Sequence, residues 1–544
     1  MTRLVEFADA NREKFPAIGY KLKKFQWTAS IHDDGAISFI KADKNAQRTI
    51  PDISRSSGVK PILLTDKAEY VLQVDKENAT EKNKVRTSQC HEAYMGLLKE
   101  CFEETKSELI LRVMKALEKR DWTLPSDMKP GDILVIKLDI DKFPHAEESV
   151  KNFWSRKVTP IADEAQNKIC FICGKKAPAI ERHSMEFSIG VDRTKLISAN
   201  DNAYLSYGLK ASEVAPTCFS CEQKYGQALS YMLRKHTSPN LKGGPHTFSV
   251  GGVTYVYWTR QNNDEVDDLI SCLSDPDQES VKRILHSTYS GFENKVDTSD
   301  FCILALTANK ARLVVRDYTE KPYWQIKEQL KQFFEAQDVG GPRLYGIYTL
   351  ASSMYRDANK EIQKYAIKEW MGWALEGREL SGLIASHILK RIQAGGKMHV
   401  LHAAAIKSWL VSQNKEVWTV HVDETKKSDS YLCGRLFAVL EKVQEDAIGG
   451  NETIASRFFG SASTAPKSIF GMLIRNSQAH LSKIGKQNKG FEVNYSKRIQ
   501  GILEGLEEFP TVLSLHEQAE FALGYYHEKQ NLFKKKPKDE GEED

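Results

Sequence analysis

The sequence predicts an α+β protein: a mixed sheet and helix N-terminal domain with an inserted zinc-knuckle loop module, followed by an all-α C-terminal helical bundle. Three observations predict this class. Strand-like alternation and hairpin turns dominate the first 320 residues, apart from a few helical stretches. Two Cys-x-x-Cys pairs interrupt that part of the chain. From about residue 321 onward, the apolar period becomes 3.6 residues and stays there.

The predicted domains follow these changes of pattern. They are an N-terminal domain (1–165), a knuckle insertion (166–235) and two hairpins that complete the N-terminal sheet (236–320). A helical domain (321–533) and a charged disordered tail (534–544) follow. The early part is expected to contain a hairpin turned at Asp34-Gly35, a helix over roughly 93–119 and a strand in 132–140.

The later elements carry clear start and stop residues. The two late hairpins are expected to turn at Gly251-Gly252 and at Asn309-Lys310. Amphipathic helices are predicted within 361–377, 379–396 and 399–413, and the first two end at glycine. Pro466 occupies a first-turn position, and Ser514 with Glu517 forms a capping box.

Composition narrows the class of protein. Lys and Arg number 77 against 73 Asp and Glu, so any contact with nucleic acid depends on an uneven distribution of charge. The chain begins without a cationic and apolar leader and has no run of 18 apolar residues, so we expect a cytoplasmic protein. Nine cysteines in 544 residues are too few for a disulfide scaffold.

Four of these cysteines have the spacing of a structural zinc site. Cys170 and Cys173 form one knuckle, and Cys218 and Cys221 form the second. Two such turns supply the four thiolates of the tetrahedron that Zn²⁺ prefers. The 44 residues between the knuckles make a long pinned loop in which we expect function. The alternative is four buried or redox-active thiols.

Two segments have residues suited to nucleic acid. The cysteine loop carries Arg193, Lys195 and Lys210, with Asn200, Asn202, Tyr204 and Tyr207 between them. Cations hold phosphates, amides can read base edges and tyrosines can stack, although polar loops are also common. In the helix after Pro466, Arg475, Lys483 and Lys486 share a side opposite Phe470, Leu473, Ile474, Leu481 and Ile484. That side is suited to a phosphate backbone, or it is an ordinary solvated face.

An enzymatic alternative comes from the knuckle region, which is similar to the zinc-knuckle form of HNH nucleases. Those enzymes need a carboxylate beside the base His and usually a second His after the distal knuckle. Here Arg182 precedes His183, and Glu222 follows Cys221, so the metal ligands for phosphodiester cleavage are incomplete. The chain also lacks a phosphate loop, a nucleophile elbow and a His-Glu-x-x-His pair.

The whole chain resembles the large subunit of the type I-C CRISPR Cascade surveillance complex. The most specific segments include ILLTDKAEYVLQ at 62–73, the first knuckle with KLISANDNAYLSYG, and TFSVGGVTYVYW. Others are LCGRLFAVLEKVQ, FFGSASTAPKSIFGMLIRNSQAHLSKI and LSLHEQAEFALGYYHEKQ. The resemblance implies a non-enzymatic subunit that checks the motif flanking the target, starts strand separation, steadies the displaced strand and docks the helicase-nuclease.

The resemblance also implies partners. They are guide RNA, the backbone and processing subunits, target double-stranded DNA and a small subunit made from the same gene. That small subunit corresponds to a bundle from about residue 422, where Val422 occupies the initiator position. For motif reading we name Lys60 and Lys67, together with Asn200, Asn202 and Lys210 in the loop, because amides and cations can hydrogen-bond bases and phosphates. A helical scaffold without contact to nucleic acid is the third alternative.

Overall fold

The computed structural model describes residues 1–53, 58–138, 142–160, 167–190, 192–198, 203, 207–209, 211–234, 246–259, 270, 272–273, 276–277, 279, 281–282, 300–395, 397–414, 417–449 and 453–533. The chain divides into two compact units. Unit 1 comprises Met1–Arg234 and Ala308–Val314, and unit 2 comprises Lys235–Thr307 and Val315–Asp544. The tail predicted at 534–544 lies outside the described residues.

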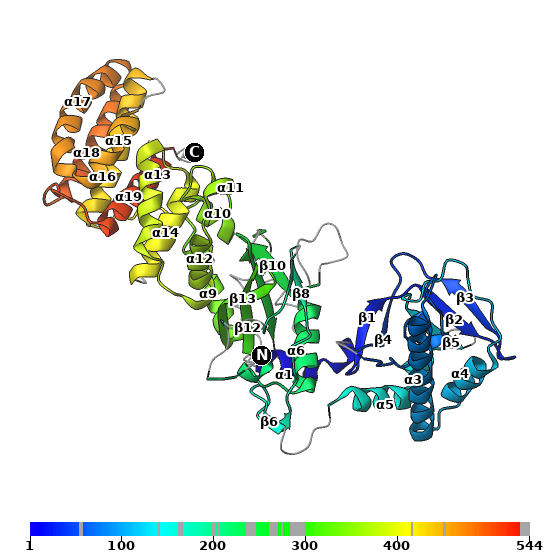
Figure 1. Ribbon diagram of the computed structural model, residues 1–544. Helices are drawn as coiled ribbons and strands as arrows, with labels where there is room; N and C mark the ends of the chain where they lie inside the picture. The colour runs from blue at the N-terminus through cyan, green and yellow to red at the C-terminus, as the bar shows by residue number, and fades with distance from the viewer. Residues whose placement is uncertain are drawn as a thin grey trace, which may run out of the picture. The chain divides into compact units, whose positions relative to one another are not determined.

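The N-terminal part of unit 1 holds two small sheets (Figure 1). One pairs β1 (Tyr20–Lys24) with β4 (Gln47–Pro51) in antiparallel register. The other has the order β3-β2-β5, from Ile37–Lys41, Trp27–Ile31 and Leu134–Leu138. The predicted hairpin around Asp34 joins β2 to β3, and the predicted strand β5 lies parallel to β2.

Helices cover these strands. They are α2 (Ala68–Val71), α3 (Glu81–Thr105), α4 (Glu108–Lys119), the 3₁₀ turn η2 (Pro144–Ala146) and α5 (Glu148–Val158). The stretch predicted as helical over roughly 93–119 is helical, but it is divided between α3 and α4 because Lys106 adopts a left-handed conformation with φ 54°. Ser107 then caps α4 by accepting a hydrogen bond from the Ile110 amide. A capping hydroxyl starts a new helix even where the apolar period continues.

The cysteine module forms the rest of unit 1. It contains two short hairpins, one of β6 (Asn167–Ile169) and β7 (Lys176–Pro178) and one of β8 (Phe187–Ile189) and β9 (Asp192–Thr194). The 3₁₀ turn η5 (Ala211–Val214) and helix α6 (Phe219–Met232) follow. The first helix, α1 (Thr2–Ala10), followed by η1 (Arg12–Lys14), packs on α6. Asp9 pairs with Lys224 at 2.8 Å, and the Phe15 and Tyr231 rings meet edge to face. The chain's first residues thus brace the module.

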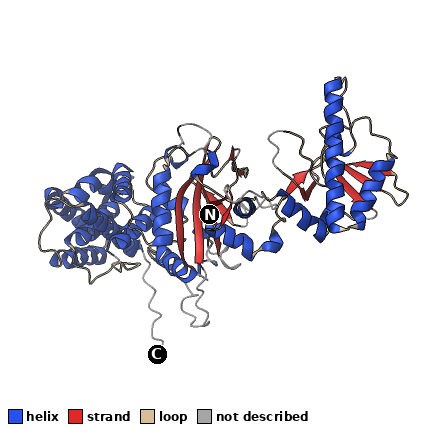
Figure 2. Cartoon of the chain, turned by 60° about the horizontal axis from the view of Figure 1, so that its bottom comes forward, coloured by secondary structure: helices blue, strands red, loops and turns tan. Residues whose placement is uncertain are grey.

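Unit 2 contains the predicted late hairpins, and they do not complete the N-terminal sheet. They form a separate four-stranded sheet, β10-β11-β12-β13, at Thr247–Val250, Val253–Thr259, Asp300–Asn309 and Arg312–Pro322 (Figure 2). Helix α9 (Tyr323–Glu335) starts directly after β13, and its buried residues share one hydrophobic core with those of the sheet. The turn glycine Gly251 has φ 58° and lies too close to Ile367 for a larger residue, since an added Cβ would be 2.5 Å from its Cγ1.

The remainder of unit 2 is helical, as predicted. Its helices α10 to α19 span Ile347–Ser352, Ala358–Glu361, Lys364–Glu376, Gly382–Gly395, Val400–Asn414, Asp429–Ile448, Ile454–Thr464, Pro466–Gln487, Lys489–Glu504 and Leu515–Phe533. Gly377 ends α12 with φ 68°, and Pro466 begins α17. The capping box is confirmed, because the Ser514 amide donates to Glu517 and the Glu517 amide donates to the Ser514 hydroxyl.

Helices α15 and α19 make the tightest contact of this region. Gly434 and Gly524 let the two backbones approach, since a Cβ on Gly434 would lie 2.0 Å from the Phe521 carbonyl oxygen. The charged pair Arg435 and Glu528 is buried at the same interface. No helix within the described ranges is long and apolar enough to cross a membrane.

Candidate metal centre and nucleic-acid surfaces

The first knuckle is a tight turn between β6 and β7. Cys170 follows β6 directly, and its amide donates to the Lys175 carbonyl at 3.0 Å. The Gly174 amide donates back to the Cys170 carbonyl at 2.8 Å, with Gly174 at φ 70°. This geometry bends the chain so that both thiols of the turn are near one point, and it favours glycine after the second cysteine.

The second knuckle is the start of a helix. Cys218 precedes α6, and Cys221 lies in its first turn. Two backbone hydrogen bonds hold the knuckles together, from the Phe171 amide to the Pro216 carbonyl and from the Ile180 amide to the Thr217 carbonyl, both at 2.9 Å. The 44-residue loop is therefore closed at its base by main-chain bonds as well as by the thiols.

The structure brings the four predicted cysteines together. Their Sγ atoms all lie within 4.8 Å of one another, and those of Cys173 and Cys218 are 4.0 Å apart. Tetrahedral Zn²⁺ with bonds of about 2.3 Å needs sulfur atoms about 3.8 Å apart, so the cluster fits this ion. Hydrogen bonding from the Cys221 thiol lowers the pKa of Cys218 to about 5, and the same contact raises the pKa of Cys221.

The HNH-like residues have structural partners. His183 is buried, and its Nδ1 lies 3.0 Å from the Tyr225 hydroxyl. Burial lowers the pKa of His183. Glu222 is also buried, and it accepts hydrogen bonds from the Ser184 and Met185 amides. Both side chains thus hold the segment after the first knuckle against α6, away from solvent.

The loop candidates are only partly described. Arg193 is exposed on β9, and the Lys195 ammonium donates to the His183 carbonyl at 3.4 Å. Main-chain bonds also tie Lys195 to Ala311 and Leu313 at the tip of the β12–β13 hairpin. Asn200, Asn202 and Lys210 lie outside the described residues.

The two lysines predicted to read the flanking motif, Lys60 and Lys67, differ in their surroundings. Lys67 lies before α2, where its amide donates to the Asp66 carboxylate and its ammonium pairs with Glu69 at 3.4 Å. Lys60 is exposed and, within the part of the chain that is described, has no ion-pair partner. The structure thus distinguishes an anchored lysine from one that is available to a ligand.

Lys60 lines a cavity of about 490 Å³ in unit 1. Three further cations line it, namely Lys21, Lys157 and Arg182. Lys21 lies 3.9 Å from Asp52, and Lys157 pairs with Glu100, whereas Arg182 has no ion-pair partner among the described residues. Sequence reasoning missed Lys21 and Lys157, because they are far from each other in the chain and stand in no motif. It considered Arg182 only as a residue unsuited to holding metal.

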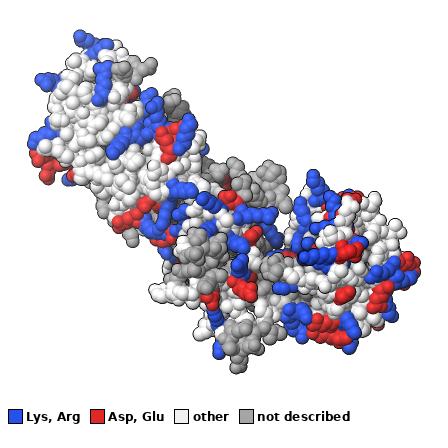
Figure 3. Space-filling model, in the orientation of Figure 1, with Lys and Arg blue, Asp and Glu red and all other residues white. Residues whose placement is uncertain are grey.

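The basic helix is α17, and the structure places its residues as predicted. Phe470, Leu473, Leu481 and Ile484 are buried, while Arg475, Lys483 and Lys486 are exposed. No Asp or Glu occurs between residues 453 and 491, a stretch that holds six Lys and Arg and covers α16 and α17. Lys and Arg side chains stand out over this end of unit 2 (Figure 3). These three cations have no ion-pair partner in the described chain, although Glu492 of α18 packs against Gly485 of α17 and Glu508 pairs with Lys467 of α17.

Comparison with known proteins supports a single family. The family model described as CRISPR-associated protein (Cas_Csd1) matches residues 3–533. No curated protein matches the chain closely enough to count as a relative. The match extends over both units and includes the four cysteines and α17.

Proposed function

The chain belongs to the Cas_Csd1 family of CRISPR-associated proteins, and from this premise we propose that it is the non-catalytic large subunit of a type I-C RNA-guided surveillance complex. It recognises the motif that flanks the target in duplex DNA, helps to open the duplex and stabilises the displaced strand. It also recruits the helicase-nuclease that degrades the DNA. Guide RNA pairing reads the target sequence itself.

The observation that carries this proposal is the exposed cations of α17, which lie in a stretch of sequence, 453–491, that has no Asp or Glu. Six cations along 39 residues without one acidic residue form a local positive field, although the whole chain is nearly neutral. A surface of this kind holds phosphates irrespective of base sequence, which suits a displaced single strand.

Removing the charge of that surface is expected to flatten the salt dependence of DNA binding. In the assembled complex, the triple variant R475A/K483A/K486A loses three phosphate contacts. The slope of log affinity against log salt for a single strand therefore falls by about 2 in magnitude. Binding titrations across a series of salt concentrations measure this slope.

A matched control removes the same charge elsewhere. Lys84, Lys151 and Lys360 each pair with a carboxylate three residues earlier in the chain, so their triple alanine variant changes net charge equally. Its salt slope is expected to match that of the wild type. Equal slopes for all three proteins would make α17 an ordinary solvated face.

The cavity of unit 1 is the proposed place for motif reading. The exposed cations Lys60 and Arg182 on its lining are free to bond to guanine edges or phosphates. The K60A/R182A variant is expected to lower the preference for the correct flanking motif over a scrambled one by about tenfold, since a base contact is worth about 1–3 kcal/mol. Competition binding with the two target duplexes measures the preference.

The control is K41A, because Lys41 lies on the same unit and already pairs with Asp127. This variant is expected to keep the wild-type preference for the correct flanking motif. Uniform weakening on both duplexes in K60A/R182A would assign the two cations to phosphates and contradict motif reading. The same assay with N200A/N202A tests the loop amides.

The proposal assigns no catalysis to the knuckle region. Its support is that both side chains are used in packing: His183 is buried beside the Tyr225 hydroxyl, and Glu222, although it lines the cavity, accepts from two main-chain amides. The four cysteines are proposed to hold one structural Zn²⁺, which would fix the base of the loop. The ion would supply folding energy and no reaction chemistry.

A further inference from the structure

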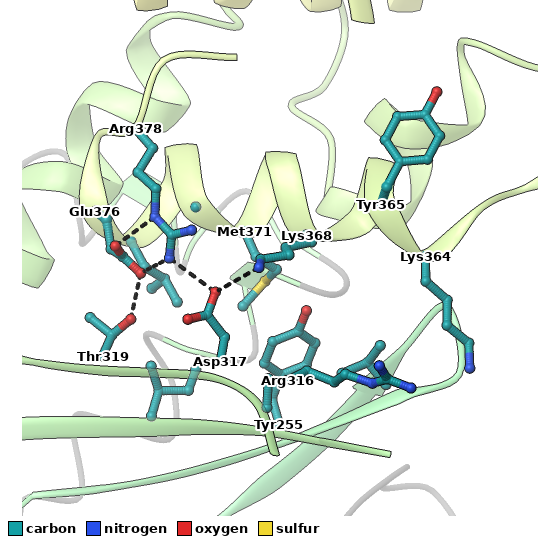
Figure 4. Close-up of a pocket in the computed structure, with 15 residues that line it drawn as sticks. Tyr255, Arg316, Asp317, Thr319, Lys364, Tyr365, Lys368, Met371, Glu376 and Arg378 are labelled. Atoms are coloured by element: carbon teal, nitrogen blue, oxygen red, sulfur yellow. Dashed lines mark hydrogen bonds and ion pairs between the residues drawn. The ribbon is translucent and has the colours of Figure 1, made fainter. Parts of the chain in front are cut away.

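Unit 2 contains a cavity of about 350 Å³ between the sheet β10–β13 and helix α12 (Figure 4). This volume lies within the range of about 300–1,000 Å³ that is usual for small-molecule sites. Strand residues Val253, Ile303 and Ala305 form an apolar floor, and Met371 and Leu375 of α12 face them. Neither the metal centre nor the basic helix contributes to it.

The hydroxyl of a buried tyrosine faces this cavity. Tyr255 is only 5% exposed, and its hydroxyl points from the sheet toward α12 (Figure 4). Within the described part of the chain, no hydrogen bond joins it to another residue. Burial raises the pKa of Tyr255, so at neutral pH the group is an available donor. The hydroxyl is not one of the fully enclosed polar atoms, so it opens on to the cavity and can donate to a ligand there.

The charged residues of the lining divide into two sets. Arg378 pairs with Glu376 and lies 3.0 Å from Asp317, and Lys368 is 3.8 Å from Asp317. These contacts neutralise both carboxylates within the lining (Figure 4). The carboxylates are therefore not the groups that attract a ligand.

Arg316 and Lys364 form the second set, at the mouth. Arg316 donates from its Nε to Thr307 at 2.8 Å, and no described residue bonds to its terminal nitrogens. Lys364 is exposed and has no ion-pair partner among the described residues. It is also the first residue of the 13-residue helix α12, whose N-terminal dipole favours an anion.

We propose that this cavity binds one unpaired nucleotide of single-stranded nucleic acid. The base enters between the apolar floor and Met371, with the Tyr255 hydroxyl bonded to its edge, and Tyr365 lies beside the opening. The phosphate lies at Arg316 and Lys364. An apolar floor beside two cations suits a flat base joined to an anion, whereas a simple anion would leave the floor unfilled.

The inference rests on the proposed function, which supplies a displaced strand. A free nucleotide has the same chemistry as a nucleotide in a strand, so the experiment needs an arm for each source. Photo-cross-linking of the full chain with a short deoxythymidine oligonucleotide that contains one 5-iodouracil, followed by peptide mass spectrometry, locates the base. Cross-links are expected on peptides that contain Tyr255, Tyr365 or Met371.

The variant R316A/K364A is expected to lower this cross-link yield about tenfold, and Y255F about threefold. The control K390A removes an exposed lysine of α13 that is not part of the lining, and its yield is expected to equal that of the wild type. Cross-links found only on α16 and α17 would overturn the cavity proposal while leaving the proposed function standing. No cross-link anywhere would count against both.

The free-nucleotide arm uses thymidine monophosphate as competitor. We expect millimolar mononucleotide to reduce the cavity cross-link only partly, because a strand gains further phosphate contacts outside the cavity. Saturable binding of the mononucleotide by a chain that shows no strand cross-link in the cavity would overturn the assignment to single-stranded nucleic acid.

Discussion

A chain carrying Cys218→Ser is expected to bind no zinc and to lose the folded structure of the cysteine module, whereas the wild type binds about one zinc per chain. Structural zinc in small modules contributes on the order of 10–16 kcal/mol at neutral pH. The hairpins of the module offer little to replace it, because strands β6 to β9 are each only three residues long, whereas α6 also packs on α1. Elemental analysis measures the metal, and hydrogen exchange of residues 167–190 and 211–234 measures the folding.

Cys101→Ala is the matched control, since Cys101 is a buried thiol of α3 outside the cluster. It is expected to retain one zinc per chain. The helices of unit 2 serve as an internal reference in both variants, and their exchange is expected to stay unchanged. Zinc-free wild-type protein with a protected module would contradict the structural zinc and favour the interpretation as buried thiols.

Glu528→Ala is expected to destabilise the C-terminal helices by about 3–5 kcal/mol. Glu528 is fully buried in α19, where it accepts hydrogen bonds from Arg435 at 2.9 Å and from Arg498. Arg435 is itself buried on α15, so the substitution leaves a guanidinium inside the protein without its main carboxylate. The remaining partner, Glu424, is largely exposed and compensates little.

The double variant R435L/E528L separates the cost of an unpaired charge from the value of the pair. Because it removes both charges together, it is expected to be more stable than E528A. In thermal unfolding followed by circular dichroism of the helices, the melting temperature of E528A is expected to be lower than that of the wild type by on the order of 10 °C. The exposed Glu504→Ala on α18 is the control, with a change near zero. A double variant as unstable as E528A would assign the loss to packing at the α15–α19 contact.

Short-range patterns in the sequence predicted much of this protein. The Asp34 hairpin, the Gly377 helix end, the Pro466 start and the Ser514 capping box all depend on residues within a few positions of one another. The basic side of α17 was predictable because helical periodicity alone sets which residues share a side. The family resemblance, carried by long specific segments, was confirmed.

One error had a local cause, and the others arose where residues distant in the chain decide the structure. Apolar periodicity continues through Lys106 and Ser107, so the break between α3 and α4 was not visible. Strand patterns say that a strand exists and leave open which strand it pairs with, so the separate sheet of unit 2 was missed. The packing of α1 on α6 joins segments more than 200 residues apart.

By itself the sequence determined the types of element, the four cysteines that meet in space and the basic helix, because spacing along the chain is enough to specify each of them. Only the tertiary structure decided which cations line each cavity, that the Tyr255 hydroxyl faces the cavity of unit 2, and that Arg435 and Glu528 meet in the core. Those features arise from contacts between elements far apart in the chain, and local periodicity carries no information about such contacts.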